Sequence, residues 1–202
     1  MRKVFISYRH NAHKDIKDKL ISLNDQFDLF IDKSVKLGDI SNDLSDETIR
    51  QIIRDKKLKD STITLFIHGS GTSKRKFIDW EIAGSMTNYN DSKQNAIIVI
   101  NTEDYALSAH NTENTDVAID VSNFVPVSKD DSKSNVYWRS VLPNAPERLI
   151  KNMTIESVCV NVIRWKDILK NPHLLKNLID KVYEYRLKND YDTSIPLKRS
   201  NG

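Results

Sequence analysis

Glu81 is the residue of this sequence whose setting most suggests chemistry. It falls four residues after Phe77 and four before Ser85, so it lies on or beside the apolar face of a predicted helix. A buried carboxylate is costly unless it has partners. Glu81 is therefore either a reactive carboxylate or a rim residue paired with Arg75 or Lys76, and the pattern alone leaves both open. The residues that define the face are Phe77, Ile78, Ile82, Ser85, Met86 and Tyr89.

Three short polar clusters each follow a predicted strand. They are Ser7-Tyr8-Arg9, Asp32-Lys33 and Gly69-Ser70-Gly71-Thr72. Ligands of open α/β sheets bind beyond the carboxyl ends of the strands, so we expect the three clusters to meet at one edge of the sheet. The glycine-containing cluster is too short for a phosphate-binding loop and lacks its lysine.

Histidine and cysteine offer weaker candidates. His10 and His13 are three residues apart but have no further ligand nearby, so we predict no metal site. His68 ends a strand, and a structural role is the more common one for such a histidine. Cys159 has no second cysteine to pair with, so we expect a buried, inert thiol and a reducing, intracellular setting.

Short apolar runs alternate with amphipathic segments along the chain. This alternation predicts an α/β fold, a parallel sheet with helices on both faces. A partial N-cap is expected at Ser45, and Pro172 is expected to be the first residue of the last helix. Strands are predicted at 4–6, 27–31, 62–67, 96–100 and 158–163, with a short one near 124–125, and helices at 14–23, after 45, at 75–89 and at 172–182.

Composition sets the limits of this interpretation. The chain has 202 residues, a formal net charge of +3 and 29% charged residues. The charge is too small and too dispersed to predict nucleic-acid binding. No apolar run reaches the roughly 18 residues of a membrane span, and the first residues turn polar too soon for a signal peptide. We therefore expect a cytoplasmic protein that binds neither nucleic acid nor membrane.

Three segments resemble a known family. The opening residues 4–9, VFISYR, look like the first strand of TIR domains. Residues 69–82, GSGTSKRKFIDWEI, resemble the turn and helix of the bacterial TIR-like proteins of Thoeris antiphage defence, with Phe77 where the family usually has Trp. The ending YDTSIPL at 191–197 is similar to a tail of this group, whereas 101–153 does not align.

The resemblance implies a flavodoxin-like TIR domain over residues 1–190, an irregular tail at 191–202, and cleavage of NAD as substrate. It implies that Glu81 is catalytic and that the loop 33–45, with Gly38 as a hinge, is a mobile lid. Ser7, Tyr8, Arg9, Asp32, Lys33, Thr72, Phe77 and Trp80 would bind the nucleotide, with rings stacking on it and Arg9 or Lys33 facing the pyrophosphate. The implied partners are other TIR domains, including further copies of this chain, and an effector that reads the nucleotide product.

Two other functions fit the same residues. A non-catalytic TIR adaptor would bind other TIR domains without needing Glu81. A nucleoside deoxyribosyltransferase-like enzyme uses a similar sheet and a glutamate, but acts on free nucleosides. A response-regulator receiver is disfavoured because it needs an acidic pair after the first strand, where this chain has Ser7 and Tyr8.

Overall fold

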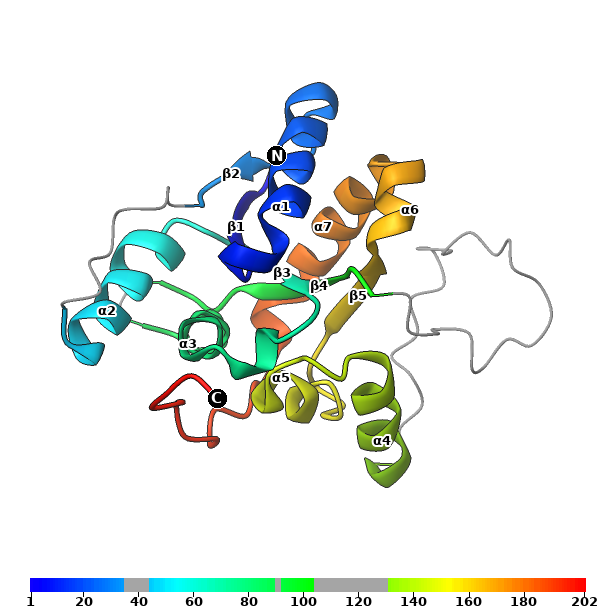
Figure 1. Ribbon diagram of the computed structural model, residues 1–202. Coiled ribbons are helices and arrows are strands. Elements are labelled where there is room, and N and C mark those ends of the chain that lie inside the picture. The colour runs from blue at the N-terminus through cyan, green and yellow to red at the C-terminus, as the bar shows by residue number, and fades with distance from the viewer. Residues whose placement is uncertain (35–43, 90–91, 104–130) are drawn as a thin grey trace.

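A computed structural model of the chain describes residues 1–34, 44–89, 92–103 and 131–202. Five parallel strands form one sheet in the order β2-β1-β3-β4-β5 (Figure 1). This order is flavodoxin-like and reverses direction between β1 and β3, so the predicted fold class is confirmed. The strands are β1 (Lys3–Ser7), β2 (Ile31–Asp32), β3 (Ile63–His68), β4 (Ala96–Asn101) and β5 (Val160–Arg164).

Helices cover both faces of the sheet. One face packs against α1 (His10–Phe27), α6 (Trp165–Lys170) and α7 (His173–Tyr185). The other face packs against α2 (Asp46–Ile52), the π-helical turn η1 (Ile53–Leu58), α3 (Lys76–Ser85), α4 (Asp131–Val141) and α5 (Glu147–Asn152). Two 3-10 turns, η2 (Thr72–Lys74) and η4 (Arg186–Lys188), complete the elements.

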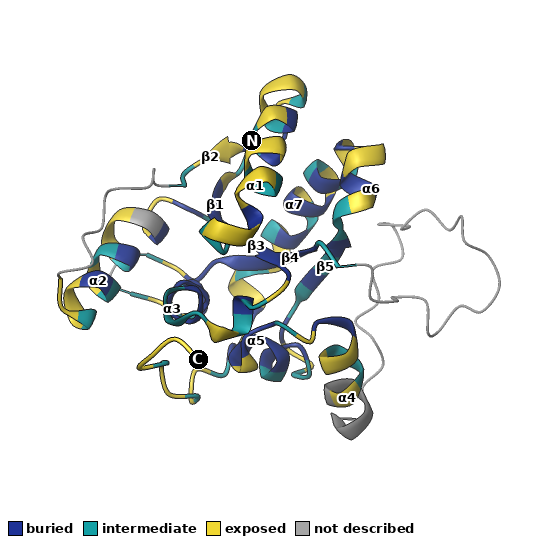
Figure 2. Ribbon diagram, viewed as in Figure 1, coloured by how far each residue is buried: buried dark blue, intermediate teal, exposed yellow. Residues whose placement is uncertain are grey.

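Burial of the central strands explains their unbroken apolar sequences. Every residue of β3 and β4 is buried, as Figure 2 shows, because helices cover both of their faces. In β1 successive side chains alternate between the two layers. Val4 and Ile6 join the core beneath α1 and α7, while Phe5 packs in the opposite layer against α2 and Trp80 of α3. Ser7 therefore faces the layer that contains α3.

The second strand is shorter than predicted, and the prediction of a strand over 27–31 is wrong. Helix α1 continues to Phe27 and ends at Asp28, which adopts the left-handed conformation with φ 51°. The backbone amides of Leu29 and Phe30 donate to Asn24 Oδ1 at 3.1 and 2.8 Å. Because a side chain satisfies these amides, the segment needs no neighbouring strand.

Other element boundaries differ by smaller amounts. Ser45 caps α2 as predicted, since its Oγ accepts a hydrogen bond from the Thr48 amide. Helix α3 ends at Ser85, four residues before the predicted end, and Pro172 is the N-cap of α7 instead of its first residue. Cys159 is half-buried, not buried. The predicted strand near 124–125 lies outside the described residues, and α4 and α5 were not predicted.

Residues 191–202 contain no helix or strand, but they pack onto the domain. The side chain of Tyr191 is buried, and its hydroxyl donates to the Asn95 carbonyl at 3.1 Å. In Figure 1 the segment passes α5 and α3, and the C-terminal end lies beside them. Among the described residues, no helix combines the length and apolar character needed to cross a bilayer.

Candidate active site

Glu81 and Ser7 meet at the carboxyl edge of the sheet. Ser7 is the last residue of β1 and is fully buried, and Glu81 is 8% exposed. The Ser7 hydroxyl donates a hydrogen bond of 2.7 Å to Glu81 Oε2. The glutamate is thus buried beside a hydrogen-bond donor at the strand-order reversal, which is where ligands of such sheets bind. Lys76, one of the two basic residues considered as a partner of Glu81, bonds Asp46 Oδ1 through its Nζ at 2.8 Å.

A second contact between α3 and the sheet fixes the position of Glu81 along the direction of the strands. Ser85, one turn later on α3, lies with its Oγ 2.7 Å from Thr64 Oγ1 of β3 and donates to the Glu81 carbonyl at 2.7 Å. Thr64 lies two residues before Phe66 in β3, towards the amino end of the strand, and Phe66 is the residue that pairs with Ser7. Helix α3 therefore runs antiparallel to the strands, and its earlier turn reaches the carboxyl edge.

Tyr8 and Arg9 follow Ser7 at this edge. Burial is the main cause of the raised pKa of the Tyr8 phenol, with smaller contributions from the charges of Asp18 and Glu81. The phenol therefore keeps its proton at neutral pH and can act as a donor. Arg9 Nη1 donates to the Ser70 carbonyl at 2.9 Å, which ties the start of α1 to the turn after β3.

That turn depends on Gly71 and Thr72. Gly71 has a φ of 71°, and a Cβ at this position would overlap Arg9 Nη1. The hydroxyl of Thr72 is buried, 2.9 Å from the Gly69 carbonyl and 2.6 Å from the Asn144 carbonyl. Thr72, predicted to bind nucleotide, thus also joins this turn to the segment between α4 and α5.

His68 has a structural environment, in agreement with the more common role. It is fully buried, its Nε2 accepts from the Asn144 amide at 3.3 Å, and its Nδ1 lies 2.9 Å from Asn101 Oδ1. These partners require the neutral ring with the proton on Nδ1. Burial lowers the pKa of His68, against smaller upward effects of Asn101 and Glu103.

His13 lies close to His68. It is 5% exposed and sits at a kink in α1 where φ is −127°. A Cβ on Gly69 would overlap its Nε2. Burial is the main cause of its lowered pKa, followed by the charge of Arg9. His10 instead lies with its Nδ1 3.2 Å from the side chain of Asn11.

The remaining predicted binding residues, Phe77, Trp80, Asp32 and Lys33, make contacts with other parts of the chain. The Trp80 ring is 3% exposed, meets Phe77 edge-on at 5.4 Å, and packs against η1 and α2. A buried ring must become exposed before it can stack on a ligand. Asp32 accepts from the Ser34 amide at 2.8 Å, and the Lys33 amide donates to the Val4 carbonyl at 2.7 Å. Most of the predicted lid 33–45 lies outside the described residues.

Three residues near the site were not identified from the sequence. Asn144 bonds the Gly71 amide through its side chain at 3.2 Å. Asp79 of α3 and Arg148 of α5 form a buried ion pair. Asn144 and Arg148 lie in the segment that could not be aligned. The one available signal was Asp79, a second acidic residue in an otherwise apolar stretch of helix.

The parallel sheet with this strand order, and a glutamate on α3 facing the end of β1, define an α/β protein of the flavodoxin-like, TIR-like class. A family model described as the TIR-like domain of the Thoeris protein ThsB matches residues 5–106. The chain belongs to this family and is a TIR-like protein of the antiphage-defence type. The match begins within β1 and includes Ser7, Glu81 and the strands β2, β3 and β4. No curated protein matches the chain.

Proposed function

We propose that the chain cleaves the nicotinamide–ribose bond of NAD and converts the rest into a cyclic or conjugated ADP-ribose signal. The observation that supports this proposal is the buried Ser7–Glu81 hydrogen bond at the carboxyl edge of the sheet. The bond restrains the carboxylate of Glu81, and a preoriented carboxylate can stabilise developing positive charge with little reorganisation.

The chemistry of NAD suits a single carboxylate. Its pyridinium is cationic, so nicotinamide leaves as a neutral molecule and needs no general acid. Ordinary glycoside cleavage differs, because it typically uses two carboxylates. In this proposal Glu81 holds the ribose hydroxyls and stabilises the oxocarbenium-like transition state, and Tyr8 and Arg9 bind the nucleotide from the β1–α1 junction.

The fate of the sugar distinguishes a signal from simple hydrolysis. Attack by water gives linear ADP-ribose, whereas attack by an atom of the nucleotide or by a second small molecule gives a cyclic or conjugated product. A conjugating enzyme must exclude water while it positions the second nucleophile. We propose the loop 33–45 as the lid that does so, and a separate effector protein as the reader of the product.

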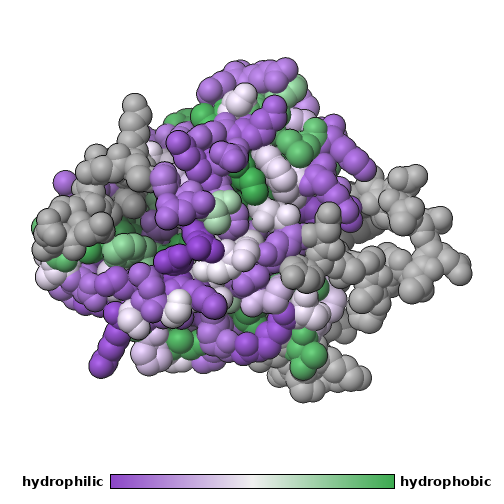
Figure 3. Space-filling view, viewed as in Figure 1, coloured by the Kyte–Doolittle hydropathy of each residue, from purple (hydrophilic) through white to green (hydrophobic). Residues whose placement is uncertain are grey.

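We also propose that activity depends on self-association or on contact with other TIR domains. Over the described residues visible in Figure 3, the surface is mostly hydrophilic, with hydrophobic residues in small separate groups. An association surface on that face would therefore be polar, and we expect salt to weaken it. Turnover per molecule should rise with protein concentration and after addition of lysate from infected cells.

The test is to incubate the purified protein with NAD, with NAD plus small acceptors such as histidine, and with free nucleosides, and to resolve the products by mass. Nicotinamide together with a cyclic or conjugated ADP-ribose is the expected result. If linear ADP-ribose is the only product besides nicotinamide, the chain hydrolyses NAD and does not make a cyclic or conjugated signal. Consumption of nucleosides alone would favour the deoxyribosyltransferase alternative, and stable NAD under every condition would favour the non-catalytic adaptor.

A further inference from the structure

A buried ion pair holds α3 two residues before Glu81. Asp79 of α3 and Arg148 of α5 are 3% and 1% exposed. Arg148 binds both carboxylate oxygens of Asp79, with Nε 2.7 Å from Oδ1 and Nη2 3.0 Å from Oδ2. A two-pronged contact of this kind fixes the direction of approach as well as the distance.

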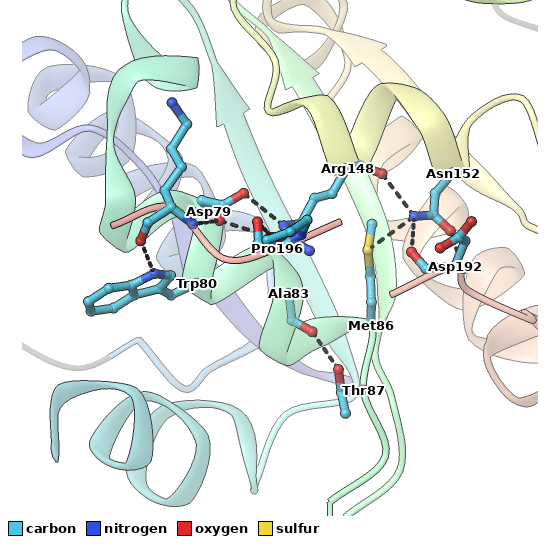
Figure 4. A network of polar contacts seen from close by, with 10 residues as sticks. Asp79, Trp80, Ala83, Met86, Thr87, Arg148, Asn152, Asp192 and Pro196 are labelled. Atoms are coloured by element: carbon cyan, nitrogen blue, oxygen red, sulfur yellow. Dashed lines mark hydrogen bonds and ion pairs between the residues drawn. The ribbon is translucent and has the colours of Figure 1, made fainter. Parts of the chain in front are cut away.

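The C-terminal segment completes the contact. The Lys198 amide donates to Asp79 Oδ2 at 2.9 Å, and Arg148 Nη2 also donates to the Pro196 carbonyl at 3.1 Å. The indole nitrogen of Trp80 donates to the Lys198 carbonyl at 2.9 Å. Figure 4 shows the backbone of this segment crossing beside α3, next to the Asp79–Arg148 contact. Two consecutive residues of α3 are thus bonded to one stretch of extended chain.

The same segment is attached at both of its ends. At its start, Asn152 Nδ2 donates to the Asp192 carbonyl and Asn152 Oδ1 accepts from the Asp192 amide, both at 2.8 Å. At its end, Asn201 Oδ1 accepts from the Lys76 amide at 3.0 Å. Amides in the first turn of a helix lack partners within the helix. Residue 201 therefore satisfies one such group at the start of α3.

Stability alone is a poor explanation for this arrangement. Burying two charges costs a desolvation penalty that their attraction often only balances, and apolar residues of similar volume frequently do as well. An apolar contact does not fix how far the helix is rotated about its axis or where it lies along that axis. Glu81 requires both to be fixed, because its carboxylate must meet Ser7 at the carboxyl edge of the sheet.

We propose that Asp79 and Arg148 are positioning residues. Together with the backbone of residues 196–198, they fix α3 so that Glu81 keeps its contact with Ser7. The inference rests on the proposed function, in which Glu81 carries the chemistry. Arg148 and the C-terminal segment lie outside the family-matched residues 5–106, so the part of the chain beyond the match sets the geometry of the site inside it.

A second two-pronged Asp–Arg pair, with a more exposed arginine, provides the control. Arg164 Nε and Nη2 bind the two oxygens of Asp167 at 2.6 and 3.0 Å, and Asp167 is 8% exposed. This pair lies where β5 leads into α6, a helix that packs on the opposite face of the sheet from α3. Its loss should affect stability without moving Glu81.

The experiment compares Asp79→Asn, Arg148→Lys, Trp80→Phe and the control Asp167→Asn. The kcat and KM for nicotinamide release are measured over a range of NAD concentrations up to saturation, well below the melting temperature of each variant. We expect Asp79→Asn and Arg148→Lys to lower kcat about tenfold with KM nearly unchanged, since small misplacements of catalytic groups have effects of this size or larger. Asp167→Asn should lower the melting temperature but keep the wild-type kcat.

Trp80→Phe separates positioning from ligand stacking. It keeps an aromatic ring but removes the hydrogen bond to Lys198 and leaves a smaller side chain in the core, so a positioning role predicts a lower kcat, by about two- to threefold, together with a lower melting temperature. A raised KM with unchanged kcat would instead mean that Trp80 contacts the nucleotide. Wild-type kcat in both Asp79→Asn and Arg148→Lys, or an equal loss in the control, would overturn the proposal.

A readout independent of activity separates this proposal from the proposed function. Hydrogen exchange should become faster across residues 76–85 and at the Ser7 amide in Asp79→Asn, but not in Asp167→Asn. If the wild-type protein leaves NAD intact, the proposed function fails, and exchange alone decides whether the ion pair positions α3. Unchanged exchange in Asp79→Asn would refute the positioning role.

Discussion

The Ser7 hydroxyl donates to Glu81 Oε2 across 2.7 Å, although the two residues are 74 positions apart in the chain. Both side chains are buried. Ser7 belongs to a strand and Glu81 to a helix, so the contact forms only when α3 has docked on the sheet. The proposed chemistry and the tertiary packing therefore depend on the same hydrogen bond.

Replacement of the carboxylate is the most direct test. We expect Glu81→Gln to reduce NAD turnover by about a hundredfold or more, because the amide keeps the shape but not the charge that stabilises the transition state. Nicotinamide release and thermal unfolding should be measured on the same preparation. Wild-type turnover would show that the assignment of Glu81 is wrong, and unfolding would show that the residue is structural.

Removal of the Ser7 hydroxyl should weaken catalysis without abolishing it. We expect Ser7→Ala to lower kcat about tenfold and stability by about 1–3 kcal/mol, since Glu81 loses a buried hydrogen-bond donor. Ser61→Ala is the control, because Ser61 is also buried and hydrogen-bonded, but to Leu58 and Asn95 at the other end of β3. Equal losses of kcat in both variants would mean that the Ser7 contact has no special role.

Gly71 and Arg9 should be coupled. Gly71→Ala places a Cβ in a left-handed conformation and against Arg9 Nη1, so we expect a loss of about 1–2 kcal/mol of stability from the backbone alone, plus displacement of Arg9. In an Arg9→Ala background the same substitution should cost less, because the overlap is gone. Urea unfolding of the four proteins in this cycle measures the coupling, and strictly additive effects would contradict the predicted overlap.

Stability should decrease on acidification through the two buried histidines. The pKa values of His68 and His13 are lowered in the folded state, so the unfolded chain binds more protons below its histidine pKa of about 6.5. Their neutral forms therefore contribute stability above about pH 6.5 that is lost as pH falls towards the folded-state values, at up to about 1.4 kcal/mol per pH unit for each histidine.

His68→Gln tests this pH dependence. It removes one titrating group while keeping an amide that can bond Asn101 and the Asn144 amide, so unfolding free energies measured between pH 7.5 and 5.5 should fall less steeply than in the wild type. His10→Gln is the control, since His10 is half-buried at the start of α1, the helix that carries His13, and its side chain bonds the neighbouring Asn11. Identical slopes in wild type and His68→Gln would disprove the linkage.

The sequence alone was sufficient for the layers of the fold and for placing Glu81 on a buried helix face. The short, mainly apolar runs at 62–67 and 96–100 are typical of strands covered on both faces, and helical spacing places Glu81 on an apolar face. These are local signals, because strand and helix periodicities can be recognised within a few residues. The second strand was misplaced because Asn24, several residues earlier, satisfies the amides of Leu29 and Phe30.

Only the tertiary structure decided what surrounds Glu81. The sequence gives no indication that Ser7 is its hydrogen-bond partner, that Trp80 is buried against α2, or that Arg148 and residues 196–198 hold Asp79. Each of these contacts joins segments far apart in the chain. Their geometry depends on how α3, α5 and the C-terminal segment pack together on the sheet, and no local pattern encodes the relative placement of packed elements.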